Sequence, residues 1–275
     1  MTTFGLRGVS VSLGGSTVLH DVTVEVPPGS VVAVVGGDGA GKTTLVRTLV
    51  GELPVDRGSV IAPDRVRIGY LPATSGSWAA LTVRQNVDFV AGVYGMRGPA
   101  LDRRREELLT RADLTAAGDR PASQLSGGMR RKLGCCLAIV HRPQLLVLDE
   151  PSTGLDPVSR LDLWRLVCEA AAGGTAVLMS TTYLDEAERA ADLVVLDAGA
   201  VLTQGPVDQV LSGFVGAVTA TGRPRRPQWA WRRGLVQHEY WPDARDVPAD
   251  DQIVIPDLED VVTAASLTHQ QRVRA

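Results

Sequence analysis

The sequence predicts an α/β fold in which helices pack against a parallel sheet, and three neighbouring features support this prediction. Residues 31–35 are a short run of Val and Ala, typical of a buried parallel strand. Residues 36–43 read GGDGAGKT and match the pattern G-x-x-x-x-G-K-[ST]. Apolar residues then repeat at i,i+4 over residues 45–50, as on one face of a helix, until Gly51 ends the pattern. The order is strand, glycine-rich loop and helix.

A loop of this kind is suited to binding phosphate. Glycines let consecutive backbone N–H groups turn inward, and the helix that follows adds the positive end of its dipole. Lys42 would reach the β- and γ-phosphates, Thr43 would place its hydroxyl on Mg²⁺, and Thr44 would supply a further donor. The residues expected to contact nucleotide here are Gly36, Gly37, Asp38, Gly39, Ala40, Gly41, Lys42, Thr43 and Thr44.

Composition describes a globular chain of 275 residues, of which 44% are hydrophobic and 21% are charged. The net charge of −3 and the pI near 5.8 show no overall excess of basic residues of the kind that binds nucleic acid, so we expect no specific nucleic-acid partner. No apolar run approaches the ~20 residues of a membrane span, and residues 1–8 lack a signal-peptide core, so we expect neither export nor membrane crossing. Cys135, Cys136 and Cys168 are odd in number and lack C-x-x-C spacing, which favours buried reduced thiols in a cytosolic compartment over disulfides or a metal site.

Segments on either side of the loop predict two further substructures. Apolar residues alternate over 9–13 and 22–26 around a Gly-Gly turn, which predicts a half-buried antiparallel ribbon. Residues 81–114 change to a helical pattern, so a mostly helical segment is inserted into the α/β chain. The residues expected in further strands of the ribbon are Val60, Val66 and Ile68.

Polar residues gather at one edge of the predicted sheet. Lys42, Asp149, Glu150 and residues 180–182 all fall just past the carboxyl ends of short apolar runs that are expected to be strands. Ligands in open α/β sheets bind at the carboxyl ends of the strands, so these residues predict a single nucleotide site. The further strands are expected over residues 145–148, 176–179 and 193–196, with a helix over 184–190 between the last two.

Residues 125–156, LSGGMRRKLGCCLAIVHRPQLLVLDEPSTGLD, resemble the nucleotide-binding subunit of an ATP-binding cassette (ABC) transporter. LSGGM is similar to the family signature, LLVLDE to its Walker B strand and STGLD to its D-loop, and the resemblance covers residues 4–212. It implies the ABC ATPase fold of the P-loop NTPases, with a RecA-like core, an antiparallel β subdomain and an inserted α-helical subdomain. We therefore expect an ABC ATPase domain over residues 1–212, with the helical insert at about 78–134, and a small C-terminal extension over 213–275.

The resemblance implies a catalytic set made of Glu150, Lys42 and Asp149. Glu150 would orient or deprotonate the attacking water, while Asp149 and Thr43 would hold Mg²⁺. The implied cofactors are ATP and Mg²⁺. The reaction is phosphoryl transfer to water, coupled to transport.

The resemblance also implies two kinds of partner. Ser126, Gly127 and Gly128 head a helix and would donate N–H groups to nucleotide held by a second ATPase subunit, in a homodimer or a heterodimer. The other partner is a separate transmembrane permease subunit, which would hold the chain at the cytoplasmic face of the cell membrane. The permease carries the substrate specificity, so the sequence does not identify the substrate.

Three positions depart from the family pattern. Ala73 stands where a glutamine usually links Mg²⁺ and the attacking water to the membrane partner, and Thr182 stands where a histidine usually contacts the γ-phosphate. Leu13 replaces the aromatic residue that commonly stacks on adenine. Losing one charge-stabilising donor costs on the order of 10²–10³ in turnover, so we expect ATP binding with slow hydrolysis.

Two arrangements fit these departures, because Glu150 and the signature are retained. In a heterodimer, this subunit would lend its signature to a competent site on its partner. In a homodimer, both sites would be slow. The sequence leaves both open.

Two other function classes compete with the exporter subunit. Soluble ABC proteins of DNA repair place coiled coils or zinc modules between loop and signature, where this chain has only residues 44–124, and translation factors usually carry two cassettes. A regulatory or immunity protein would bind ATP without driving transport. An adjacent reading frame for a multi-span membrane protein would favour the exporter subunit.

The C-terminal segment combines arginines with tryptophans. Residues 223–233, RPRRPQWAWRR, are expected to form a Pro-rich linker whose arginines pair with acidic residues at 243–251. Contact with anionic lipid or with nucleic acid is the alternative. Residues 256–262, PDLEDVV, resemble the short tail helix that closes ATPase subunits of bacterial drug, antibiotic and polysaccharide exporters, which favours that branch.

Overall fold

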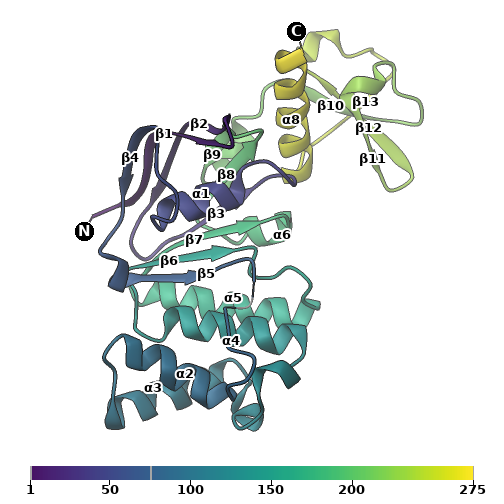
Figure 1. The fold of residues 1–275 in the computed structure, drawn as a ribbon. Coiled ribbons are helices and arrows are strands. Elements are labelled where there is room, and N and C mark those ends of the chain that lie inside the picture. Colours follow the sequence, from purple (N-terminus) through teal and green to yellow (C-terminus); the bar gives the residue numbers. More distant parts are fainter. Residues whose placement is uncertain (1, 75, 275) are drawn as a thin grey trace.

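The computed structural model describes residues 2–74 and 76–274, and its largest sheet has the strand order β5-β6-β7-β3-β8-β9 (Figure 1). The first five of these strands are parallel, and β9 joins β8 in antiparallel pairing. The predicted α/β fold with a parallel sheet is therefore confirmed. The strands are β3 Val31–Val35, β5 Ile68–Leu71, β6 Leu145–Asp149, β7 Ala176–Thr181, β8 Asp192–Asp197 and β9 Ala200–Gly205.

The predicted ribbon is an antiparallel sheet of β1 (Phe4–Leu13), β2 (Ser16–Val26) and β4 (Arg57–Ile61), in the order β2-β1-β4. The expectation for two of its residues is wrong. Val66 lies in a 3-10 turn, and Ile68 opens β5 of the parallel sheet. The reason is close packing: a Cβ on Gly69 would lie 2.1 Å from the carbonyl oxygen of Ala138, which belongs to α4 (Gly127–Ile139). Strand β5, which includes Ile68 and Gly69, therefore lies against α4, in the main sheet.

The two faces of the main sheet pack against different partners. Helices α4 and α5 (Pro157–Ala172) cover one face, while α1 (Lys42–Leu49) and the ribbon cover the other. Alternate residues of β6 divide accordingly, with Leu146 and Leu148 among the helices and Leu145 and Val147 on the ribbon side. This alternation is the period of a strand buried on both faces.

The predicted helical segment consists of α2 (Val83–Val93) and α3 (Gly98–Arg111), which lie beyond α4 at the end of the molecule away from α8 (Leu258–Arg274) (Figure 1). α6 (Leu184–Ala187) is shorter than the expected helix over 184–190, because the chain turns before entering β8. Within residues 2–74 and 76–274, no helix is both long and apolar enough to span a membrane.

The C-terminal segment is folded, and the linker expected over residues 223–233 is wrong. This stretch contributes β11 to a four-stranded sheet in the order β11-β12-β10-β13. β11 pairs with β12 in antiparallel register, with Trp231 directly opposite His238. The strands are β10 Ala217–Thr221, β11 Ala230–Arg233, β12 Val236–Trp241 and β13 Gln252–Val254.

Ion pairs stabilise the C-terminal segment, and its long helix packs against the main sheet. Arg225 pairs with Asp250 and Asp251, as the charge pattern predicts. Arg226 instead pairs with the fully buried Glu239. The tail helix α8 is longer than expected, and its Leu258 and Val261 are buried against β8 and α7 (Val207–Ser212).

Candidate functional site

The glycine loop lies between β3 and α1 and is shaped by two glycines. A Cβ on Gly36 would lie 2.2 Å from the carbonyl oxygen of Leu196 in β8, so only glycine fits there. Gly41 has φ of 104°, in the region that favours glycine, and it directly precedes α1. The loop therefore presents its N–H groups at the start of a helix, where phosphate binds favourably.

Lys42 is nearly buried at the first position of α1, with 5% of its surface exposed. Its Nζ donates to the carbonyl oxygens of Gly36 at 2.8 Å and Gly37 at 3.1 Å, and it lies 3.2 Å from Oε1 of Glu150. The structure thus brings together the loop lysine and the acidic residue after β6. The pocket around them is lined by Val18, Gly37, Asp38, Gly39, Ala40, Gly41, Lys42, Thr43, Thr44 and Glu150.

Asp149 ends β6 with its carboxylate buried. Its Oδ1 accepts a hydrogen bond from the Ser180 hydroxyl at 2.7 Å. Its Oδ2 is buried and finds no hydrogen-bond partner in the described part of the chain. Asp149 is not among the described residues that line the pocket, but the next residue, Glu150, and Thr43 both are. A carboxylate oxygen without a partner, one residue from the pocket wall, and the Thr43 hydroxyl are the kind of oxygen ligands that Mg²⁺ prefers.

Glu150 adopts a left-handed backbone conformation, with φ of 47°. Its N–H donates to the hydroxyl of Ser180 at 2.9 Å, and its Oε2 accepts from the Thr153 hydroxyl at 3.2 Å. A non-glycine residue at positive φ is strained and requires support from its surroundings. Here that support turns the carboxylate toward Lys42.

Arg131 is a site residue that sequence reasoning missed. Its guanidinium donates to the carbonyl oxygens of Asp149, Glu150 and Pro151, and also to those of residues 72–74. Burial lowers the pKa of Arg131. One side chain therefore ties the acidic end of β6 to the segment containing Ala73. The sequence signal was weak, because arginines at 130 and 131 are both reasonable on an exposed helix.

All three departures from the family pattern lie on the surface. Ala73 and Thr182 are both exposed. Beside Thr182, the buried Glu186 accepts hydrogen bonds from Thr181 at 2.7 Å and Ser152 at 2.8 Å. Glu186 was not predicted, since a Glu in a short acidic helix looks like a solvated residue.

The signature residues stand apart from the glycine loop. Ser126 caps α4 by accepting from the N–H of Met129 at 3.2 Å, and both Ser126 and Gly127 are exposed. Of the described residues lining the loop pocket, none belongs to 126–128, and none is Leu13, which is 40% exposed at the end of β1. Val18 of β2 lines the pocket instead.

A parallel strand, a glycine loop that opens a helix, and a second strand that ends in an acidic pair are the phosphate site of a P-loop NTPase. Residues 19–153 match the family described as ABC transporter. A relative in this family is 34% identical over 77% of this chain and 72% of its own length. The chain therefore belongs to the family of ABC transporter ATP-binding proteins.

That relative is the Nod factor export ATP-binding protein I of Bradyrhizobium diazoefficiens. Daunorubicin resistance ATP-binding protein DrrA3 of Streptomyces coeruleorubidus is 36% identical over 76% of this chain and 70% of its own. The probable multidrug ABC transporter ATP-binding protein YbhF of Escherichia coli is 42% identical over 64% of this chain. The match covers only 32% of YbhF, so this chain corresponds to about a third of that relative.

Solved structures confirm the predicted ABC ATPase fold. One described as an ATP binding subunit of an ABC transporter has a TM-score of 0.72 and 29% identity, covering 78% of this chain and 93% of its own. The dimeric bacterial ABC transporter cassette MJ0796 has a TM-score of 0.65 and 20% identity, covering 74% of this chain and 98% of its own. The second likeness concerns the fold alone.

Proposed function

We propose that this chain is the ATP-binding subunit of an ABC exporter and hydrolyses ATP to drive a separate transmembrane permease at the cytoplasmic face of the membrane. The observation that carries the proposal is the phosphate pocket, where Nζ of Lys42 lies 3.2 Å from Oε1 of Glu150. The preceding residue, Asp149, has a buried carboxylate oxygen without a partner among the described residues. Relatives named for Nod factor export and daunorubicin resistance support the exporter branch.

In this proposal, Lys42 exchanges its contact with Glu150 for the β- and γ-phosphates of ATP. The Glu150 carboxylate is then free to orient the attacking water and to accept its proton. The Thr43 hydroxyl and the Asp149 carboxylate would hold Mg²⁺, which neutralises phosphate charge when bound. The N–H groups of the glycine loop hold the remaining phosphate oxygens.

We propose that residues 1–212 form the ATPase domain, with the helical insert at about 78–134, and that residues 213–275 are an extension. The start of α4 at Ser126, Gly127 and Gly128, of which the first two are exposed, would complete the nucleotide site of a second ATPase subunit. Leu13 would contact adenine through apolar surface without stacking.

Hydrolysis at this chain's own site is proposed to be slow, because Ala73 and Thr182 lack the amide and the imidazole usual in the family. A homodimer would then have two slow sites, whereas a heterodimer would pair this chain with a competent subunit. The second candidate function is an ATP-binding regulatory or immunity protein. The same two positions favour it, because both affect hydrolysis more than binding.

Steady-state ATP hydrolysis by the purified chain tests the proposal, with Glu150→Gln as the control and ATP binding measured in both. Turnover that Glu150→Gln abolishes supports a self-sufficient homodimer. Tight ATP binding without Glu150-dependent turnover supports a binding-biased subunit, either beside a catalytic partner or in a regulatory protein. Absence of ATP binding in both proteins would contradict the proposal.

A further inference from the structure

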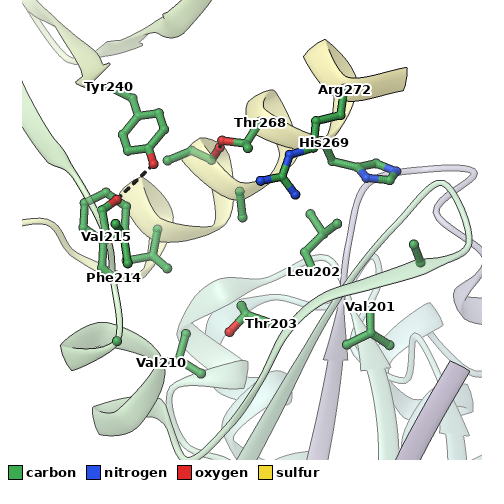
Figure 2. A pocket seen from close by; sticks show the side chains of 15 residues that line it. Val201, Leu202, Thr203, Val210, Phe214, Val215, Tyr240, Thr268, His269 and Arg272 are labelled. Carbon is green, nitrogen blue, oxygen red and sulfur yellow. Dashed lines mark hydrogen bonds between the residues drawn. The ribbon is translucent and has the colours of Figure 1, made fainter. Parts of the chain in front are cut away.

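A cavity of about 390 Å³ lies between the edge strand β9, helix α7 and helix α8 (Figure 2). Small-molecule sites have volumes of roughly 300–1,000 Å³, so this cavity is large enough for a ligand. It shares no described lining residue with the phosphate pocket. It is therefore a separate site.

One part of the cavity wall is apolar. The apolar side chains of this wall belong to β9, α7 and α8 and to the segment that follows α7. A ligand in the cavity would therefore contact the main sheet and α8 together. Phe214 also packs beside the ring of Tyr240, whose hydroxyl donates to the carbonyl oxygen of Val215 at 2.9 Å. The apolar lining includes Leu202, Val210, Phe214, Val261, Ala264 and Ala265.

The α8 end of the cavity carries the cationic side chain of Arg272. His269 and Arg272 lie three residues apart on one face of α8, and Figure 2 shows both side chains there. Neither has a hydrogen bond or ion pair with any residue that the structure describes, and no described lining residue is acidic. By contrast, Arg225, Arg226 and Arg233 of the same extension all pair with carboxylates.

We propose that this cavity binds a small amphipathic organic anion. Its aliphatic or aromatic body would lie against the apolar wall, and its carboxylate would pair with Arg272. A charge-assisted pair at one end and buried apolar surface at the other is the composition of a site selective for such a ligand.

The cavity is joined to the phosphate loop by a short turn. Ala200 lines the cavity, and the preceding residue, Gly199, donates its N–H to the carbonyl oxygen of Ala40 in the loop at 2.9 Å. We include in the proposal that occupation of the cavity changes nucleotide affinity through this turn. This second part rests on nucleotide binding at the loop, and linkage requires the effect to be reciprocal.

Isothermal titration of the nucleotide-free full chain with sodium octanoate tests the site without requiring hydrolysis. Octanoate should bind to the unaltered chain. Its affinity for the Arg272→Ala chain should be roughly tenfold lower or more, and the uncharged probe octan-1-ol should bind the unaltered chain more weakly than octanoate by a similar factor. Arg103→Ala, an exposed arginine on α3, is the matched control and should leave octanoate affinity unchanged. Failure of octanoate to bind, or equal affinity in Arg272→Ala, would overturn the proposal.

A second variant separates loss of the site from misfolding. Ala265→Trp would fill the cavity from α8, so octanoate binding should disappear while the thermal unfolding midpoint stays near that of the unaltered chain. Unaltered octanoate affinity in a folded Ala265→Trp chain would refute this location. For coupling, saturating ADP should change octanoate affinity by about fivefold or more, and an unchanged affinity would refute the coupled part alone.

Discussion

Lys42 and Glu150 form an ion pair across the phosphate pocket, with Nζ 3.2 Å from Oε1. Lys42 opens α1 after one parallel strand, and Glu150 follows another, so parallel strand order brings them to the same sheet edge. The backbone of Glu150 has a positive φ of 47° at this position. Nζ of Lys42 also donates to the carbonyl oxygens of Gly36 and Gly37.

Restoring the family residues should accelerate hydrolysis. In Ala73→Gln/Thr182→His, two charge-stabilising groups return to the site, so ATP turnover should rise on the order of 10²-fold or more. Phosphate release at saturating ATP measures this rise. Adding Glu150→Gln to the double variant must abolish the gain, and turnover equal to that of the unaltered chain would show that these positions do not limit hydrolysis.

Arg131→Met should destabilise the fold. The substitution keeps an apolar stem but leaves buried carbonyl oxygens at the end of β6 without their donor, which costs about 2–4 kcal/mol of unfolding free energy. Urea denaturation followed by circular dichroism measures the change. Arg130→Met one position away is the comparison and should cost less, because among the described residues Arg130 donates only to the Leu125 carbonyl oxygen, at 3.3 Å. Equal losses would contradict the role assigned to Arg131.

Two glycine-to-alanine substitutions should have opposite effects. Gly69→Ala would push a Cβ into the Ala138 carbonyl oxygen, so it should cost about 3 kcal/mol or more. Gly92→Ala, exposed in α2 with open space around its Cα, should stabilise the chain by about 0.5–1 kcal/mol. Thermal and urea unfolding measure both. A tolerated Gly69→Ala would mean that β5 does not lie against α4.

Acid sensitivity should depend partly on His141. Its ring stacks on Tyr94 with centroids 3.6 Å apart, and burial lowers its pKa to about 4. Between pH 6.5 and 4 the unfolded chain therefore binds more protons at this residue, and the stability it contributes is lost as the pH falls. His141→Phe keeps a stacked ring but cannot titrate. The loss of unfolding free energy from pH 7 to pH 4.5 should be smaller in this variant, and equal losses would exclude His141 as a contributor.

The parts of the site that form from consecutive residues were predictable. The strand, the glycine loop and the helix over residues 31–50 occur where the pattern placed them, because each rests on local spacing. Ile68 was assigned to the wrong sheet, because a short apolar run fits either a ribbon or a buried strand. Residues 223–233 were predicted to be a linker because they are rich in proline and arginine. Part of this stretch is a strand, which is stabilised by pairing with β12 and not by a local pattern.

The sequence by itself determined the chemistry of the phosphate loop, the acidic pair after β6 and the family, because each depends on residue types at fixed spacing. The tertiary structure alone decided which distant groups meet. Arg131 joins the carbonyl oxygens around Ala73 to those of the acidic pair, and α8 closes a cavity over β9. The physical reason is that such contacts depend on how elements distant in sequence pack, and no local periodicity encodes that packing.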